Sequence, residues 1–379
     1  MLRFFMLLSV LFLLLFSWPL IEKQMEGTDL QKTIDHLLSE VTDLKENPET
    51  IAAFDSIKES FQELLKQFNL QAEELSDSKQ EIEPNQKEIE LNTPTEQMFS
   101  VYNIELGKPK SEIDHSFGAP KRSSINEYGT YWYTYHENYQ DFFMVMYDEE
   151  DNVAGLYTNQ GLIASTIGIK LDSSKESVRT KLGEPLTKIQ KGMVIYQLQE
   201  NSDNDIFQAG GAYVTIFYDK HEGDTVTAIQ LISEDLEQKK TDFYTKASPS
   251  LKEGFELQMF DLTNATRVNH QLPILLWDDH VRETARSHSE DMAKNQYFDH
   301  TNLEGQSPFD RMEEDNVTFM LAGENLATGQ LSSIFAHEGL MNSLGHRENI
   351  LKEDYEFLGV GVAFNQKSQP YYTQNYFAK

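Results

Sequence analysis

Histidine and glutamate side chains are concentrated near the end of this chain, where they could bind a metal ion or transfer protons. Six of the ten histidines lie between residues 270 and 346. The stretch HEGLMNSLGHRENIL opens with His337 and Glu338, as the zinc-peptidase motif H-E-x-x-H does. That motif needs its second histidine one helical turn later, on the same face. Met341 stands there instead, and His346 comes roughly half a turn out of phase, so the motif is excluded.

Helices and strands alternate around these residues, as the spacing of the apolar side chains indicates. Helical spacing covers about residues 255–270, 279–295, 307–314 and 332–343, and strand-like runs cover residues 319–327, 357–364 and 371–377. Elements in this order predict a layered domain of the α+β class over about residues 255–379. This domain must bring the histidines and glutamates together if they form one site.

Three segments of this domain together resemble the CAP superfamily, which includes cysteine-rich secretory, antigen 5 and pathogenesis-related proteins and bacterial SCP-like proteins. The segments are NATRVNHQLPILLWDDHVRETARSHSEDMAKNQYFDH, AGENLA and EGLMNSLGHRENIL. The resemblance implies an α-β-α sandwich with a cleft lined by two histidines and two glutamates. Matched by motif, these four residues are His300, Glu324, Glu338 and His346. We call them the tetrad.

The sequence departs from the family pattern in two ways. The family usually has a tryptophan two residues after the second glutamate, where this chain has Leu340. Leucine fills apolar volume but lacks the aromatic face and the indole N–H, so packing near the cleft should differ. The disulfides of animal and plant members are also missing, and the core must be stable without them.

The tetrad is suited to more than one chemistry. Two neutral imidazoles and two carboxylates could bind Zn²⁺ or another divalent cation, act as general acid and base, or only cross-link a polar cleft. The main expectation is a non-enzymatic extracellular module that binds a metal and an envelope, lipid or peptide ligand. The alternatives are a metal-assisted, peptidase-like hydrolase with Glu324 or Glu338 as base, and a structural or regulatory surface protein.

The middle of the chain, about residues 98–235, contains an internal repeat. Ile104 and Gly118 recur as Ile169 and Gly183 at a constant offset of 65 residues. Each copy is predicted to begin with a short strand and a helix that ends at the glycine. Aromatic, strand-like runs follow, TYWYTYH and FFMVMYD in the first copy and MVIYQLQ and AYVTIFYD in the second. The pattern predicts a duplicated helix-plus-antiparallel-sheet domain, which resembles the N-terminal domain that accompanies CAP domains in Gram-positive bacteria.

The chain opens with an apolar run of 18 residues, from residue 4 to residue 21, with Arg3 before it and Glu22 after it. This length is near the minimum that spans a bilayer and exceeds a usual signal-peptide core. Residues 1–22 are therefore expected to be an uncleaved signal anchor with the N-terminus inside, or else the signal peptide of a secreted protein. Either way, the protein is expected outside the cell.

Two polar segments follow the apolar run. Residues 28–75 carry two amphipathic helical stripes, which predict a helical stalk that could self-associate, or two helices packed on the next domain. Residues 76–97 are polar and are predicted to be a linker.

Composition excludes several classes of function. The net charge is −30, which argues against nucleic-acid binding because that would need a basic face. The chain has no cysteine, so disulfides, thiolate metal sites, a catalytic cysteine and a lipidated cysteine are excluded.

Overall fold

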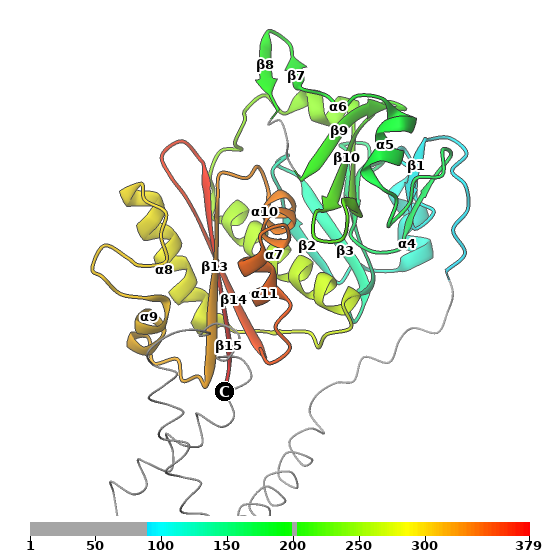
Figure 1. Cartoon of the computed structure of the whole chain (residues 1–379). Helices are drawn as coiled ribbons and strands as arrows, with labels where there is room; N and C mark the ends of the chain where they lie inside the picture. The colour runs from blue at the N-terminus through cyan, green and yellow to red at the C-terminus, as the bar shows by residue number, and fades with distance from the viewer. Residues whose placement is uncertain (1–88, 199–202) are drawn as a thin grey trace, which may run out of the picture. The chain divides into compact units, whose positions relative to one another are not determined.

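The structure is a computed structural model of the chain, and it describes residues 89–198 and 203–379 (Figure 1). The signal anchor or signal peptide, the helical stalk and most of the linker expected from the sequence lie outside the described residues. No helix within the described ranges is long and apolar enough to cross a membrane. The end of the linker is described, and Glu105 accepts hydrogen bonds from the backbone N–H groups of Thr95, Glu96 and Gln97.

The repeat region forms one antiparallel sheet of seven strands in the order β2-β3-β4-β5-β11-β10-β9. The strands are β2 (Arg122–Ile125), β3 (Tyr131–Glu137), β4 (Gln140–Tyr147), β5 (Val153–Thr158), β9 (Asn204–Ala209), β10 (Ala212–Asp219) and β11 (Thr225–Ser233). The first repeat supplies β2 to β5 and the second supplies β9 to β11. The two halves meet where β5 pairs with β11, with Thr158 opposite Ile229. Duplication has therefore produced one continuous sheet, as expected for the duplicated domain.

Each repeat also contributes one short helix, α4 (Lys110–Phe117) and α5 (Lys175–Leu182). Both helices end at the repeated glycines, Gly118 and Gly183, whose φ angles are 71° and 84°. Side chains other than glycine rarely adopt such angles, which explains why the glycine recurs at this position. Ile113 of α4 and Val178 of α5 are buried in one core cluster with the sheet.

Both faces of this sheet are buried. In β4, Phe143 and Val145 belong to the cluster that contains α4 and α5, whereas Met144 and Met146 belong to a second cluster shared with the C-terminal region. Alternate residues of a strand point to opposite faces, so a strand buried on both sides needs an unbroken apolar run. The run FFMVMY meets this need.

The repeat region differs from expectation in two details. The short strands expected near Ile104 and Ile169 lie slightly earlier, as β1 (Phe99–Val101) paired with β6 (Ile163–Ser165). The run MVIYQLQ lies outside the large sheet, in a hairpin of β7 (Lys188–Lys191) and β8 (Val194–Gln197). Strand β9, and not this run, forms that edge of the large sheet. The sequence did not predict β9, because its few apolar residues give no strong alternating pattern.

The C-terminal region forms a second sheet of four strands in the order β12-β14-β15-β13. The elements are α7 (Pro249–Asn269), β12 (Leu276–Trp277), α8 (Asp279–Asn295), α9 (Pro308–Glu314), β13 (Leu321–Thr328), α10 (Ser333–Met341), α11 (Leu344–Ile350), β14 (Phe357–Phe364) and β15 (Pro370–Ala378). The three expected strands and four expected helices are present. Two short elements, β12 and α11, were not expected.

Helices cover both faces of the four-stranded sheet, which confirms the expected fold class. Leu358, Val360 and Val362 of β14 lie in the cluster that contains α7 and α10. The residues between them, Gly359 and Gly361, face α8, where an added Cβ would lie 2.1–2.6 Å from atoms of that helix. Glycine is therefore required for α8 to approach the sheet this closely. The arrangement is an α-β-α sandwich.

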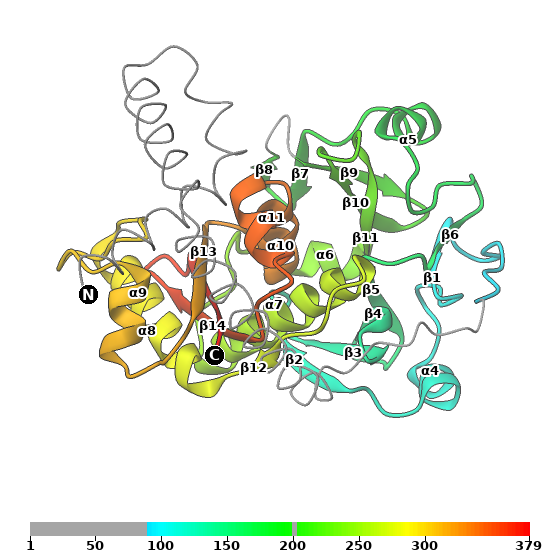
Figure 2. The ribbon, with the colours of Figure 1, turned by 60° about the horizontal axis from the view of Figure 1, so that its bottom comes forward.

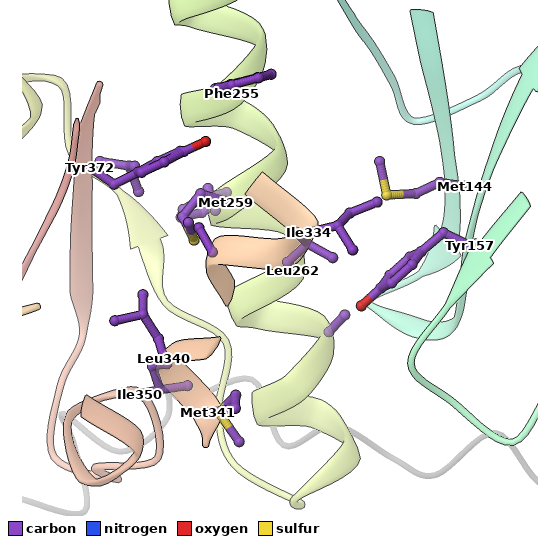
Figure 3. Close-up of a cluster of buried hydrophobic side chains, with 14 of the residues drawn as sticks. Met144, Tyr157, Phe255, Met259, Leu262, Ile334, Leu340, Met341, Ile350 and Tyr372 are labelled. Atoms are coloured by element: carbon purple, nitrogen blue, oxygen red, sulfur yellow. The ribbon is translucent and has the colours of Figure 1, made fainter. Parts of the chain in front are cut away.

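The two sheets share one core. Met144 and Tyr157 of the seven-stranded sheet pack in the same cluster as Met259 of α7 and Ile334 of α10 (Figure 3). Helix α7 lies so close to β2 that a Cβ on Gly254 would stand 2.1 Å from the carbonyl oxygen of Ile125. Within the described residues, the repeat region and the C-terminal sandwich therefore form a single compact unit.

Candidate functional site

Three side chains from separate elements meet at the centre of the site. His300 lies in the loop between α8 and α9, Arg311 lies on α9, and Glu324 lies on β13. The Nδ1 atom of His300 is 2.9 Å from Oε1 of Glu324, and Nη2 of Arg311 is 2.7 Å from Oε2. The Glu324 side chain is 1% exposed and that of His300 is 50% exposed. A buried carboxylate thus holds one imidazole at the surface.

The contact with Glu324 affects the pKa of His300 and determines which of its ring nitrogens carries a proton. The hydrogen bond to the carboxylate raises the pKa of His300, against the opposing effect of partial burial. A carboxylate only accepts, so Nδ1 carries the proton and Nε2 is the nitrogen left for a ligand. Arg311 also donates to the carbonyl oxygen of His300 at 2.8 Å, which fixes the loop.

His346 lies on α11 and is half-buried. Burial is the main cause that lowers the pKa of His346, and the charge of His300 lowers it further. Its Nδ1 atom is buried and has no hydrogen-bond partner among the described residues. Asn325 donates to the carbonyl oxygen of His346 at 3.0 Å, and Asn349 donates to that of Glu324 at 3.2 Å, which joins α11 to β13.

Glu338 is placed differently from the other tetrad residues. It lies on α10 and is 4% exposed. The hydroxyl of Tyr157, from β5 of the repeat region, donates to Oε1 of Glu338 at 2.6 Å. Burial is the main cause that raises the pKa of Glu338 to about 7, and the charge of Asp219 adds to it. The second glutamate therefore lies in the interface between the repeat region and the sandwich.

The two glutamates of the tetrad have different partners in the structure. Glu324 already accepts from His300 and Arg311, and Glu338 accepts from Tyr157. In residues 89–198 and 203–379, no group of three or more His, Asp or Glu side chains is arranged to hold a metal ion. On each imidazole the nitrogen left to meet a cation is Nε2, because Nδ1 of His300 is bonded to Glu324 and Nδ1 of His346 is buried.

Neighbouring residues have structural roles. His337 is fully buried, its Nε2 lies 2.7 Å from the hydroxyl of Thr266, and burial lowers its pKa to about 3. Leu340, which stands where the family usually has tryptophan, is buried in the core shared by the two sheets.

Sequence reasoning missed two residues of this site, Arg311 and Tyr157. Arg311 lies 13 residues before Glu324, and Tyr157 lies 181 residues before Glu338. The segment SPFDRM around Arg311 shows only a helix start, and GLYTNQ around Tyr157 shows only a strand. Contacts at these separations depend on the tertiary fold and have no local pattern.

Comparisons with known proteins agree with this architecture. A family model described as CAP-associated N-terminal matches residues 106–243, and the model of the cysteine-rich secretory protein family matches residues 260–376. A crystal structure of an extracellular SCP-domain protein from Bacillus anthracis str. Ames aligns with a TM-score of 0.64 and 25% identity, covering 79% of this chain and all of that one. One from Staphylococcus aureus aligns at 0.58 and 15% identity, covering 77% of this chain and all of its own, and shows the fold alone.

Two relatives from Bacillus subtilis (strain 168) are also similar. The membrane protein YlbC is 30% identical over 307 residues, which cover 76% of this chain and 86% of YlbC. The protein YkwD is 36% identical over 135 residues, which cover 36% of this chain and 51% of YkwD. Fold and site together define a bacterial CAP-domain protein. The chain belongs to the cysteine-rich secretory protein family, although it contains no cysteine.

Proposed function

We propose that this chain is an exported, non-enzymatic binding protein of the cell surface, in which His300 and His346 together hold a divalent cation such as Zn²⁺. The observation that carries the proposal is the 2.9 Å contact between half-exposed His300 and buried Glu324. A carboxylate bonded to one imidazole nitrogen orients the ring and makes the other nitrogen a better metal ligand. Glu324 would therefore position His300.

Arg311 supports the assignment of Glu324 as a residue that positions His300 and does not itself bind the metal. Its guanidinium lies 2.7 Å from Glu324, and both side chains are almost completely buried. A buried carboxylate paired with arginine is stabilised as the anion but has its charge offset, so it attracts a metal cation less strongly. Glu324 thus serves as an acceptor for His300.

The ligand we propose is an envelope component that carries carboxylate or phosphate oxygens. A cation held by two imidazoles keeps open positions, and Zn²⁺ accepts oxygen donors in them. The chain has a net charge of −30, so direct ionic attraction to an anionic polymer is unfavourable. A cation between protein and polymer would supply the missing attraction.

The relatives support a location at the cell surface. One is described as an extracellular protein and another as a membrane protein. The apolar run at residues 4–21 would provide export and, if it is not cleaved, attachment to the membrane.

The hydrolase alternative has less support. A general base must reach the proton of an attacking water. Both oxygens of Glu324 accept hydrogen bonds within the protein, and Glu338 is buried against Tyr157. Peptide or envelope hydrolysis that disappears in Glu324→Ala would establish this alternative.

Binding to purified Gram-positive cell-envelope fragments tests the proposed function. The full chain is sedimented with the fragments in the presence of Zn²⁺ or of a chelator. We expect binding with Zn²⁺ and its loss with the chelator and in the double variant His300→Ala/His346→Ala. Equal sedimentation of the wild type and the double variant under both conditions would contradict the proposal.

A further inference from the structure

The turn between β10 and β11 lies against the segment that carries His346. Oδ2 of Asp219, the last residue of β10 before this turn, is 2.7 Å from Nη1 of Arg347, and both side chains are about 90% buried. Arg347 is the residue next to His346. The contact therefore joins the repeat region directly to α11.

A second group of contacts lies on the other side of His346, at Asn342. Its Nδ2 donates to the carbonyl oxygen of Tyr218 at 2.8 Å, and its Oδ1 accepts from the backbone N–H of Lys220 at 3.0 Å. Nε2 of His221 lies 3.2 Å from the carbonyl oxygen of Asn342. Asn342 and Arg347, on either side of His346, are thus both held by one turn. In Figure 2, α10 and α11 appear between β13 of the sandwich and strands β10 and β11 of the large sheet.

The turn itself is braced by Asp219. Its Oδ1 accepts from the backbone N–H groups of His221 and Glu222 at 2.8 Å and 3.2 Å. Its backbone carbonyl oxygen accepts from the backbone N–H group of Asp224 at 2.9 Å. One carboxylate therefore fixes the turn with one oxygen and binds Arg347 with the other. Such an element restricts the position of the segment it holds.

The position of the His346 ring depends on this support. Its Nδ1 has no hydrogen-bond partner within the described ranges, so no bond to that atom orients the ring. The backbone of α11 must place it, and that backbone is held by Asn325 on one side and by the turn on the other. Small displacements of ligand groups strongly reduce binding.

We infer that the β10–β11 turn is a clamp that positions His346 for ligand binding, so that the duplicated domain is an integral part of the CAP-domain site. The inference rests on the proposed function, because it concerns the same histidine pair. Asp219, Asn342 and Arg347 are positioning residues. The bond between Tyr157 and Glu338 attaches the preceding helix, α10, to the same domain.

The test compares two aspartates in the full chain. Asp219→Asn removes the charge that binds Arg347. Asp205→Asn is the matched control, because Asp205 is also buried and accepts from Arg179 at 2.8 Å, but within the repeat region alone. Zn²⁺ binding is measured by calorimetry and thermal unfolding by circular dichroism. We expect both variants to unfold at lower temperature, and only Asp219→Asn to bind Zn²⁺ on the order of tenfold more weakly.

The outcomes separate the clamp from the proposed function. If the wild type binds Zn²⁺ and both variants bind equally well, the clamp is wrong and the proposed function stands. If the wild type does not bind Zn²⁺, the proposed function fails. The clamp is then judged by NMR of ¹³C-labelled histidine, with the His346 signal assigned from His346→Gln. A His346 signal that shifts or broadens in Asp219→Asn but not in Asp205→Asn supports a positioning role, and unchanged signals overturn it.

Discussion

Glu324 and Glu338 show how environment gives two glutamates of one expected tetrad different roles. Glu324 lies between a histidine and an arginine, and each of its oxygens accepts from one of them. Glu338 lies in the domain interface beside a tyrosine hydroxyl, and burial disfavours its charge. The motifs identified both residues but did not indicate this difference, because it arises from Arg311 and Tyr157, which are distant in sequence or supplied by another domain.

Replacing Glu324 by glutamine should lower the pKa of His300. The carboxylate stabilises the protonated imidazole, and its hydrogen bond is the main cause of the raised pKa. Stability from this pair is fully present below the pKa of unfolded histidine, near 6.5, and is lost as pH rises through the higher folded value. An NMR titration of the His300 ring in wild type and Glu324→Gln measures the change. An unchanged His300 pKa would contradict the assignment of Glu324 as its partner.

Replacing Glu338 by glutamine should stabilise the protein above neutral pH. The folded pKa of Glu338 is about 7, against 4.5 for an unburied glutamate, so the folded state binds the proton more tightly. Wild-type stability from this group therefore falls as pH rises from about 4.5 to 7, by on the order of 3 kcal/mol. Glutamine keeps an acceptor for Tyr157 and has no charge to bury.

Urea unfolding of both proteins at pH 5 and pH 8 measures this effect. We expect the advantage of Glu338→Gln over the wild type to be larger at pH 8. An advantage that is equal at both pH values, or larger at pH 5, would show that Glu338 is not a buried, proton-binding carboxyl.

At the scale of elements, strongly patterned segments were predictable and short ones were not. Helix α8 and strand β14 have the bounds expected from sequence, since the first begins at an aspartate cap and both have continuous apolar patterns. Helix α11 was missed because its seven residues carry few apolar side chains. The hairpin of β7 and β8 was assigned to the large sheet because apolar composition alone does not distinguish a sheet strand from an exposed hairpin.

Substitutions at two helix glycines test the close packing of α7 against β2. Gly254→Ala places a methyl group 2.1 Å from the carbonyl oxygen of Ile125, whereas Gly339→Ala on α10 meets no atom within 4 Å. Overpacking should lower the free energy of unfolding of Gly254→Ala by roughly 1–3 kcal/mol. Higher helix propensity should raise that of Gly339→Ala by about 0.5–1 kcal/mol. Chemical denaturation measures both, and equal effects would contradict the close approach of α7 to β2.

At the scale of the whole molecule, the repeat region and the CAP sandwich share one core. The sequence predicted two adjacent domains, because it shows a duplicated segment followed by a family motif. It could not show that the second face of the large sheet is buried against α7 and α10. An unbroken apolar run such as FFMVMY indicates burial on both faces, but not by what.

A shared core predicts cooperative unfolding. Residues of both regions lose the same packing when either region opens, so scanning calorimetry of the full chain should show one transition for residues 89–379, with calorimetric and van't Hoff enthalpies in agreement. Resolved transitions for the repeat region and the sandwich would mean that the interface is weak.

In the proposed site the two histidines bind a cation, while Glu338 belongs to the domain interface. The most direct measurement is a calorimetric titration of Zn²⁺ into the full chain, into His300→Ala/His346→Ala and into Glu338→Gln, each confirmed as folded by circular dichroism. We predict roughly one ion per wild-type chain, in line with one site built from two imidazoles, no specific binding by the double variant, and wild-type affinity in Glu338→Gln. Absence of binding by the wild type, or its loss in Glu338→Gln, would contradict the account.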